Sequence, residues 1–457
     1  MTAKIKTHQF ANGFRLIYEK SSNDLPLSAV NVFCDVGSID EPESLFGASH
    51  LVEHMCFKGT RKHAESKDIF VQYDEIGAYI NAFTTNRATG YVVKCNSIYL
   101  QNSLRILADM MLHSVFDRGE FAKEHQVVIE ENIKDENSPS DVILVESDRA
   151  IYAGSSFGHP VDDVSFHLSK TGALRKDSLK HADVVAFYRR FYHPKNMILS
   201  VVSDLSFESI LRMVKTTDYV KCGRGGNAAI AAVVSCRNYT LSPKTNIEVR
   251  MIPKSGVENV LLSIAFRVCG NGSRDKYCLE FIKNVLVNTM SGRFFMVLRE
   301  KRGLVYSCSI STQYYDTVGD FTIFTQTDRR KVLGGSGGRH GVVSSFVGIF
   351  NDLIKHGITD EELRVVRGYM KGNSLIDNED INNQSQYNAE QYLMGGEAAE
   401  IVSLRDVYSR FYDKLTRDDI HTVIRRYFTP ANLCVCVLGD HLPARESIEK
   451  EFRRFTA

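Results

Sequence analysis

Three residues that could bind and use a metal ion lie within one short stretch, His50-Leu51-Val52-Glu53-His54. In a helix, residues three and four positions apart share a face, so His50, Glu53 and His54 would project together. Two imidazoles one turn apart can bind a single metal ion, and a carboxylate between them can take a proton from a water that the metal activates. The spacing therefore predicts a zinc-dependent hydrolase centre on a helix.

A match to one short pattern can also arise by chance, so the chain must supply a third ligand. The helical pattern at residues 120–135 offers Glu124, Glu130 and Glu131. Periodicity favours Glu131, because its face also carries two valines and Glu124, whereas the face of Glu130 is more polar. Glu124 would then orient a ligand from behind. Surface ion pairs are the alternative interpretation for both Glu131 and Glu124.

Composition narrows the class of protein. The chain has 457 residues, 43% apolar and 24% charged, with a net charge of +1, so neither nucleic acid nor an anionic membrane is indicated as a partner. We expect no membrane span, because the longest apolar runs contain polar residues. The ten cysteines form no C-x-x-C pair, which favours a reducing compartment. We expect a cytoplasmic protein or one of a mitochondrion-type matrix, and not a secreted one.

An internal match indicates two related halves. Residues 188–204 align without gaps to residues 424–440, sharing Arg-Arg-aromatic-aromatic, a proline, an asparagine and a strand that closes on Asp. A weaker echo relates residues 30–37, which precede the motif helix, to residues 262–270. The second half carries Cys278-Leu279-Glu280-Phe281 where a metal motif would be needed. It is therefore predicted to keep the fold without the ligands.

We expect a first half at 1–215 carrying the zinc site, a linker at 216–245 and a second half at 246–457. The glycine-rich stretch at 334–341 lacks the Gly-Lys-[Ser/Thr] ending of a phosphate loop and is predicted to be a surface loop. Apolar patterns predict a hairpin at 10–18, strands at 27–36, 79–85, 90–95 and 197–202, and helices at 98–115, 120–135 and 182–191.

Four segments of the chain resemble motifs of the pitrilysin-type (inverzincin) zinc metallopeptidases. Residues 50–60 resemble the His-x-x-Glu-His helix with its Phe-Lys-Gly-Thr exit, and residues 124–131 resemble the third-ligand helix. Residues 77–84 are similar to the active-site edge strand, and residues 299–307 to the signature of the second half. The resemblance covers nearly the whole length and points to the short two-half subunits, which include mitochondrial processing peptidase beta and bacterial-type zinc proteases.

The resemblance implies a role for each matching residue. One zinc ion per chain would be held by His50, His54 and Glu131, with Glu124 supporting them and Glu53 as general base. The substrate would contact Asn81, Ala82, Arg299 and Tyr306. A helix cap and a core position are the alternatives for Arg299 and Tyr306.

The implied fold is α+β, with two homologous halves that each hold a mostly antiparallel sheet flanked by helices and that enclose a central chamber. The implied activity is hydrolysis of peptide bonds in unstructured peptides or presequences, by a metal-activated water with Glu53 as base. A non-catalytic scaffold or partner-binding subunit of a processing-peptidase-like complex is the alternative. A homodimer, or a heterodimer with a homologous subunit, is compatible with either function.

Overall fold

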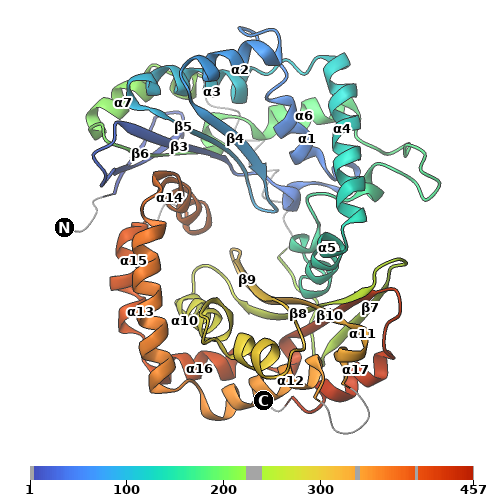
Figure 1. Ribbon diagram of the computed structural model, residues 1–457. Coiled ribbons are helices and arrows are strands. Elements are labelled where there is room, and N and C mark those ends of the chain that lie inside the picture. The colour runs from blue at the N-terminus through green and yellow to red at the C-terminus, as the bar shows by residue number, and fades with distance from the viewer. Residues whose placement is uncertain (1–4, 223–238, 335–339, 397–399, 456–457) are drawn as a thin grey trace. The chain divides into compact units, whose positions relative to one another are not determined.

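The computed structural model describes residues 5–222, 239–334, 340–396 and 400–455 (Figure 1). The chain forms two compact units. Unit 1 comprises Met1–Lys134, His159–Asn238 and Ser374–Asp406, and unit 2 comprises Asp135–Gly158, Tyr239–Asn373 and Val407–Ala457. Each unit therefore includes a segment from the other half of the sequence. Unit 1 includes residues 374–406, and unit 2 includes residues 135–158. Much of the expected linker, at 223–238, and of the glycine-rich loop, at 335–339, lies outside the described residues.

Unit 1 is built on a six-stranded sheet of order β1-β2-β6-β3-β5-β4. The strands are β1 (Lys6–Gln9), β2 (Arg15–Lys20), β3 (Leu27–Cys34), β4 (Tyr79–Thr84), β5 (Thr89–Asn96) and β6 (Met197–Ser203). All neighbours are antiparallel except β2 and β6. The turn between β1 and β2 is closed by Asn12 Oδ1, which accepts the Phe14 N–H, and by Gly13 at φ +89°. The predicted hairpin is confirmed.

Unit 2 repeats this topology in a five-stranded sheet of order β7-β11-β8-β10-β9. Its strands are β7 (Glu248–Pro253), β8 (Asn259–Cys269), β9 (Cys308–Tyr314), β10 (Val318–Asp328) and β11 (Leu433–Gly439). Again one pair, β7 and β11, is parallel and the other pairs are antiparallel. Strand by strand, this order corresponds to β2-β6-β3-β5-β4 of unit 1. The internal repeat predicted from the sequence is therefore a repeat of structure.

Each sheet is flanked by helices, as expected, and the helices cover both of its faces. In unit 1, α1 (Ala48–Met55), α3 (Leu100–His113), α6 (His181–Phe191) and α7 (Phe207–Lys215) lie on one face, and α14 (Ile381–Gly395) lies on the other (Figure 1). In unit 2, α10 (Asp275–Lys283), α12 (Val342–His356), α16 (Arg417–Tyr427) and α17 (Arg445–Phe452) share one face, and α5 (Pro139–Ile151) covers the other. The central strands are buried on both faces, so each sheet needs this second cover.

The remaining helices are α2 (Ser66–Glu75), α4 (Arg118–Asn137), α8 (Asp218–Lys221), α11 (Arg329–Val332), α13 (Asp360–Asp377) and α15 (Leu404–Arg410). Two segments, Asn284–Asn288 and Phe295–Lys301, are wound as π-helix. Within the described part of the chain, every helix is too short or too polar to cross a membrane.

Candidate metal centre

The motif residues lie on α1, a short helix that is fixed at both its start and its apolar face. Leu51, Val52 and Met55 are buried in the core of unit 1. The helix follows Gly47, whose φ of +85° suits glycine. The Glu41 carboxylate accepts hydrogen bonds from the backbone N–H groups of Gly47 and Ser49, at 2.8 and 2.7 Å. These bonds satisfy donors that have no partner inside the helix, so Glu41 holds the start of α1 in place.

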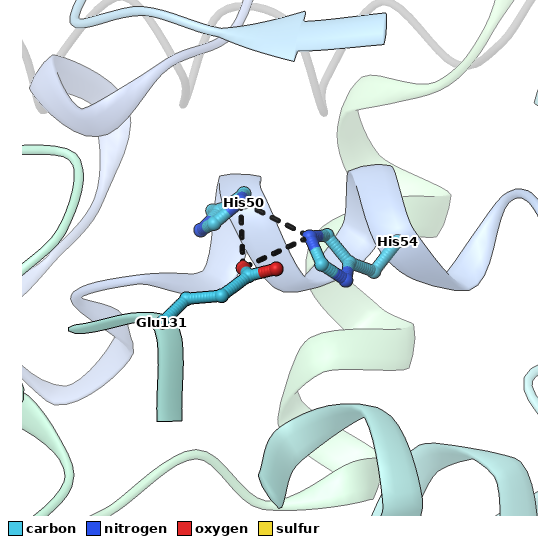
Figure 2. Close-up of side chains that lie close together, drawn as sticks. All are labelled: His50, His54 and Glu131. Atoms are coloured by element: carbon cyan, nitrogen blue, oxygen red, sulfur yellow. Dashed lines mark hydrogen bonds and ion pairs between the residues drawn. The ribbon is translucent and has the colours of Figure 1, made fainter. Parts of the chain in front are cut away.

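The three predicted ligands converge on one point, as Figure 2 shows. The Nε2 atoms of His50 and His54 lie 3.1 Å apart, and Glu131 Oε2 lies 3.9 and 3.5 Å from them. Zinc–ligand bonds of ~2.1 Å at tetrahedral angles separate ligand atoms by roughly 3.4 Å. The three side chains therefore have the spacing of a zinc site without any rearrangement of α1 or α4.

The outer nitrogen of each imidazole faces a carboxylate. His50 Nδ1 lies 2.6 Å from Asp162 Oδ1, and His54 Nδ1 lies 3.1 Å from Glu124 Oε2. Carboxylates accept hydrogen bonds, so each Nδ1 is placed to donate and each Nε2 is directed at the shared point, where a metal ion can take the place of a proton. Two lone pairs and a carboxylate oxygen directed at one point suit a divalent cation, and this nitrogen and oxygen donor set fits zinc.

The charges around His50 reinforce this arrangement. Burial alone would lower the pKa of His50, but Asp162, Glu53 and Glu131 raise it to about 9. Negative charge is therefore concentrated where the ligand atoms meet, and the centre attracts a cation. Burial also raises the pKa of Glu53, whose residue is only 9% exposed. A carboxylate with a raised pKa is suited to accept a proton near neutral pH.

Glu124, which was predicted to orient a ligand, contacts His54 from α4. Its second oxygen, Oε1, lies 2.8 Å from Lys58 Nζ, so the buried carboxylate is paired on both sides. The argument from periodicity for Glu131 was partly wrong, however. Val127 is 37% exposed, and the Glu131 side chain is 46% exposed. Glu131 lies at the margin of the buried face of α4, because a ligand must reach out of the core towards α1.

The predicted substrate strand, β4, is the last strand of the unit 1 sheet and pairs with β5 on one side. Asn81 Oδ1 accepts the Ala82 N–H at 2.9 Å. Thr84 Oγ1 donates to Glu53 Oε2 at 2.5 Å. This hydrogen bond joins the edge strand to the predicted general base. β4 therefore both presents a backbone edge that is unpaired among the described residues and positions the Glu53 carboxylate.

Arg299 and Tyr306 lie in unit 2 and contact each other. The Arg299 guanidinium is 4.9 Å from the centroid of the Tyr306 ring, and Tyr306 is 76% exposed. The interpretation of Tyr306 as a core residue is therefore wrong. In the second half, Glu280 of α10 accepts hydrogen bonds from Thr312 and Tyr314. Glu280 therefore stabilises packing in unit 2, at the position that corresponds to the metal-binding motif of unit 1.

Sequence reasoning missed Asp162, Thr84 and Lys58. Lys58 and Thr84 lie inside the segments 50–60 and 77–84 that carry the resemblance, and Lys58 follows His54 by four residues, so helical spacing could have indicated it. Asp162 lies in an irregular segment between α5 and α6, where no periodic pattern predicts what a side chain contacts.

Comparison with known proteins agrees with this fold. Residues 16–161 match the family model described as insulinase (peptidase family M16), and residues 178–368 match the model described as the peptidase M16 inactive domain. The chain belongs to peptidase family M16, the pitrilysin-type proteases of two related halves.

Bacterial zinc proteases are among its relatives. An uncharacterized zinc protease of Bacillus subtilis (strain 168) is 28% identical over 392 residues, which cover 86% of this chain and 89% of that protein. A second, from Streptomyces coelicolor, is 24% identical over 413 residues, 90% of this chain and 85% of that protein. The crystal structure of a protease from Helicobacter pylori has the same fold, with a TM-score of 0.83, 19% identity, and coverage of 96% of this chain and 100% of that chain.

Proposed function

We propose that this protein is a zinc-dependent endopeptidase that hydrolyses peptide bonds in unstructured peptides. The observation that carries the proposal is the convergence of His50 Nε2, His54 Nε2 and Glu131 Oε2 beside Glu53, with a carboxylate behind each imidazole. The names of the relatives, which are zinc proteases, support the choice of metal.

The proposed chemistry divides between the ion and the chain. Bound zinc supplies Lewis acidity, which acidifies water and polarises the scissile carbonyl. Glu53 takes the proton from the attacking water and delivers it to the amine nitrogen as the C–N bond breaks. Thr84 fixes Glu53 through Oε2, so the carboxylate meets the water in one orientation. Asp162 and Glu124 face the Nδ1 atoms and so orient both Nε2 atoms towards the shared point.

The proposed substrate binds as an extended strand. A β4 edge that pairs only with β5 offers backbone groups to an incoming peptide, and such pairing depends little on side-chain identity. A folded protein cannot present an extended segment without local unfolding, so flexible peptides and presequences are the preferred class. We retain Arg299 and Tyr306 as proposed substrate contacts, because both side chains are accessible and stack on each other.

A digest of a peptide library by the isolated chain tests the proposal. We expect cleavage by the chain alone, loss of cleavage with a zinc chelator, and recovery when zinc but not magnesium is returned. Equal cleavage with and without the chelator would contradict a metal-dependent reaction. Absence of cleavage under all conditions, with zinc bound, would favour the non-catalytic or partner-dependent subunit instead.

A further inference from the structure

A second group of metal-ligating side chains lies in unit 1, apart from the centre on α1. Asp109 and His113 are one helical turn apart on α3, and Asp218 begins α8. One carboxylate or imidazole atom from each of the three lies within 4.8 Å of the other two. His113 Nε2 is 3.0 Å from Asp218 Oδ2. Asp, His and Asp form a donor set that binds zinc in proteins.

Asp109 is the unusual member of this group. It lies between buried apolar residues of α3, and its side chain is only 2% exposed. Its Oδ2 accepts a hydrogen bond from Thr60 Oγ1 and lies 3.2 Å from His63 Nδ1. Its Oδ1 is buried and has no hydrogen-bond partner in the described part of the chain. A carboxylate oxygen that is buried and accepts no hydrogen bond is stabilised by a nearby cation.

The cation nearest to this oxygen is Lys62, and its fit is poor. Lys62 Nζ lies 3.4 Å from Asp109 Oδ1 and 3.3 Å from Asp218 Oδ2, longer than the ~2.7–2.9 Å of a strong charge-assisted hydrogen bond. The Lys62 side chain is 60% exposed, so holding it there restricts a flexible chain for a weak ion pair. The ammonium donates a hydrogen bond to Asp218 Oδ2 but leaves Asp109 Oδ1 without a hydrogen-bond donor among the described residues.

We propose that Asp109, His113 and Asp218 form a second zinc site, in which the metal ion displaces Lys62 Nζ. Asp109 Oδ1, His113 Nε2 and one Asp218 oxygen are the ligands, and His63 and Thr60 orient Asp109 through its other oxygen. One atom of each residue already lies within 4.8 Å of the other two, and the ion would draw these atoms to the ~3.4 Å separation of a tetrahedral site. The ion would join α8 to α3 and so stabilise unit 1.

Zinc content of the full-length chain, after removal of all metal and reloading with zinc alone, tests this second site. We expect about two zinc ions per chain in the wild type and about one in His113→Ala, His50→Ala and His54→Ala. Peptide cleavage is expected to persist in His113→Ala and to be lost in His50→Ala. Lys62→Met, which removes the competing ammonium, is expected to bind the second zinc at least as tightly as the wild type.

A matched control is His356→Ala. His356 follows Asp352 by four residues on α12, with Nδ1 2.9 Å from Oδ1, but both side chains are more than half exposed. Its zinc content should equal that of the wild type. One zinc in the wild type, unchanged in His113→Ala and lost in His50→Ala, would overturn the second site and leave the proposed function intact. One zinc lost only in His113→Ala would support the second site and overturn the catalytic centre.

Discussion

Each imidazole of the metal centre is held by a carboxylate that comes from a different part of the chain. Glu124 lies on α4, in the same segment as Glu131, and helical spacing relates the two. Asp162 comes from the irregular chain between α5 and α6 and reaches His50 Nδ1 at 2.6 Å. Such outer carboxylates fix the tautomer and the ring orientation of a ligand, and so raise its affinity for the metal.

Asp162→Asn should weaken zinc binding roughly 10–100-fold, because an amide cannot stabilise the Nδ1 hydrogen of His50 as a carboxylate does. Competition with a chelator of known affinity measures this effect. The control is Asp163→Asn, since an asparagine oxygen can still accept the Ser165 N–H that Asp163 accepts at 2.7 Å. Equal zinc affinities for the two variants would refute the assigned role of Asp162.

The residues of the site were predictable to the extent that they share a helix. His50, Glu53 and His54 followed from spacing alone, and Glu131 followed from the face of α4, although Val127 on that face is exposed. Asp162 was not predictable, because contacts between a loop and a helix leave no periodic trace in the sequence.

Among the elements, α1 is short and depends on a residue outside it. An isolated helix of this length is not stable in water, and its first N–H groups need acceptors. Glu41 supplies them from a fully buried position, where desolvation disfavours the charged carboxylate. Burial raises the pKa of Glu41 to about 7, against the lowering effect of its hydrogen bonds to Ser49 and Gly47.

This shift predicts a pH dependence of stability. The pKa of Glu41 is higher in the folded chain than in the unfolded chain. The contribution of the neutral carboxyl to the free energy of unfolding is therefore fully present below about pH 4.5 and is lost as the pH rises to about 7. Glu41→Gln should remove that loss, on the order of 2–3 kcal/mol in the free energy of unfolding. Urea unfolding of the metal-free chain at a series of pH values measures it.

Glu43→Gln is the control, because Glu43 is exposed in the neighbouring 3₁₀ turn, Glu43–Leu45. Its stability should follow the wild type at every pH. If Glu41→Gln and the wild type lose stability in parallel as the pH rises, Glu41 is ionised in the folded chain at low pH, and the account of its burial is wrong.

Most of the elements that were predicted, nearly all of them in the first half, lie within a few residues of the observed ones. The strand expected at 79–85 is β4, Tyr79–Thr84, and the helix expected at 98–115 is α3, Leu100–His113. Their periodicities are clear, because one face of α3 is buried and because exposed and partly buried residues alternate along most of β4. The packing of α14 on the second face of the unit 1 sheet, and of α5 on the second face of the unit 2 sheet, was not predicted. Sequence patterns relate only residues that are close in the chain.

At the scale of the whole molecule, the two units share one topology and exchange segments. Residues 374–406 follow most of the unit 2 sheet in sequence but belong to unit 1. Their anchor is Glu19 of β2, which is fully buried. Its carboxylate accepts hydrogen bonds from Asn388, Ser403 and Arg405. This cluster fixes the exchanged segment to the unit 1 sheet.

Arg405→Met should destabilise unit 1 by about 3–5 kcal/mol, because it leaves the buried Glu19 carboxylate without its cation. The double variant Glu19→Gln/Arg405→Met should recover part of this loss. Urea unfolding gives the comparison. Arg417→Met, which breaks the exposed Arg417–Asp360 pair, should cost less than about 1 kcal/mol. Equal effects of the two single variants would show that the Glu19 cluster does not anchor the segment.

The most direct test of the catalytic centre is to measure zinc content and peptide cleavage together in Glu53→Gln. Glu53 is assigned to proton transfer and not to the metal, so zinc content should equal that of the wild type while cleavage falls by roughly 10²–10⁴-fold. Glu130→Gln, an exposed change on α4, should alter neither quantity. Wild-type cleavage by Glu53→Gln, with zinc retained, would contradict the account.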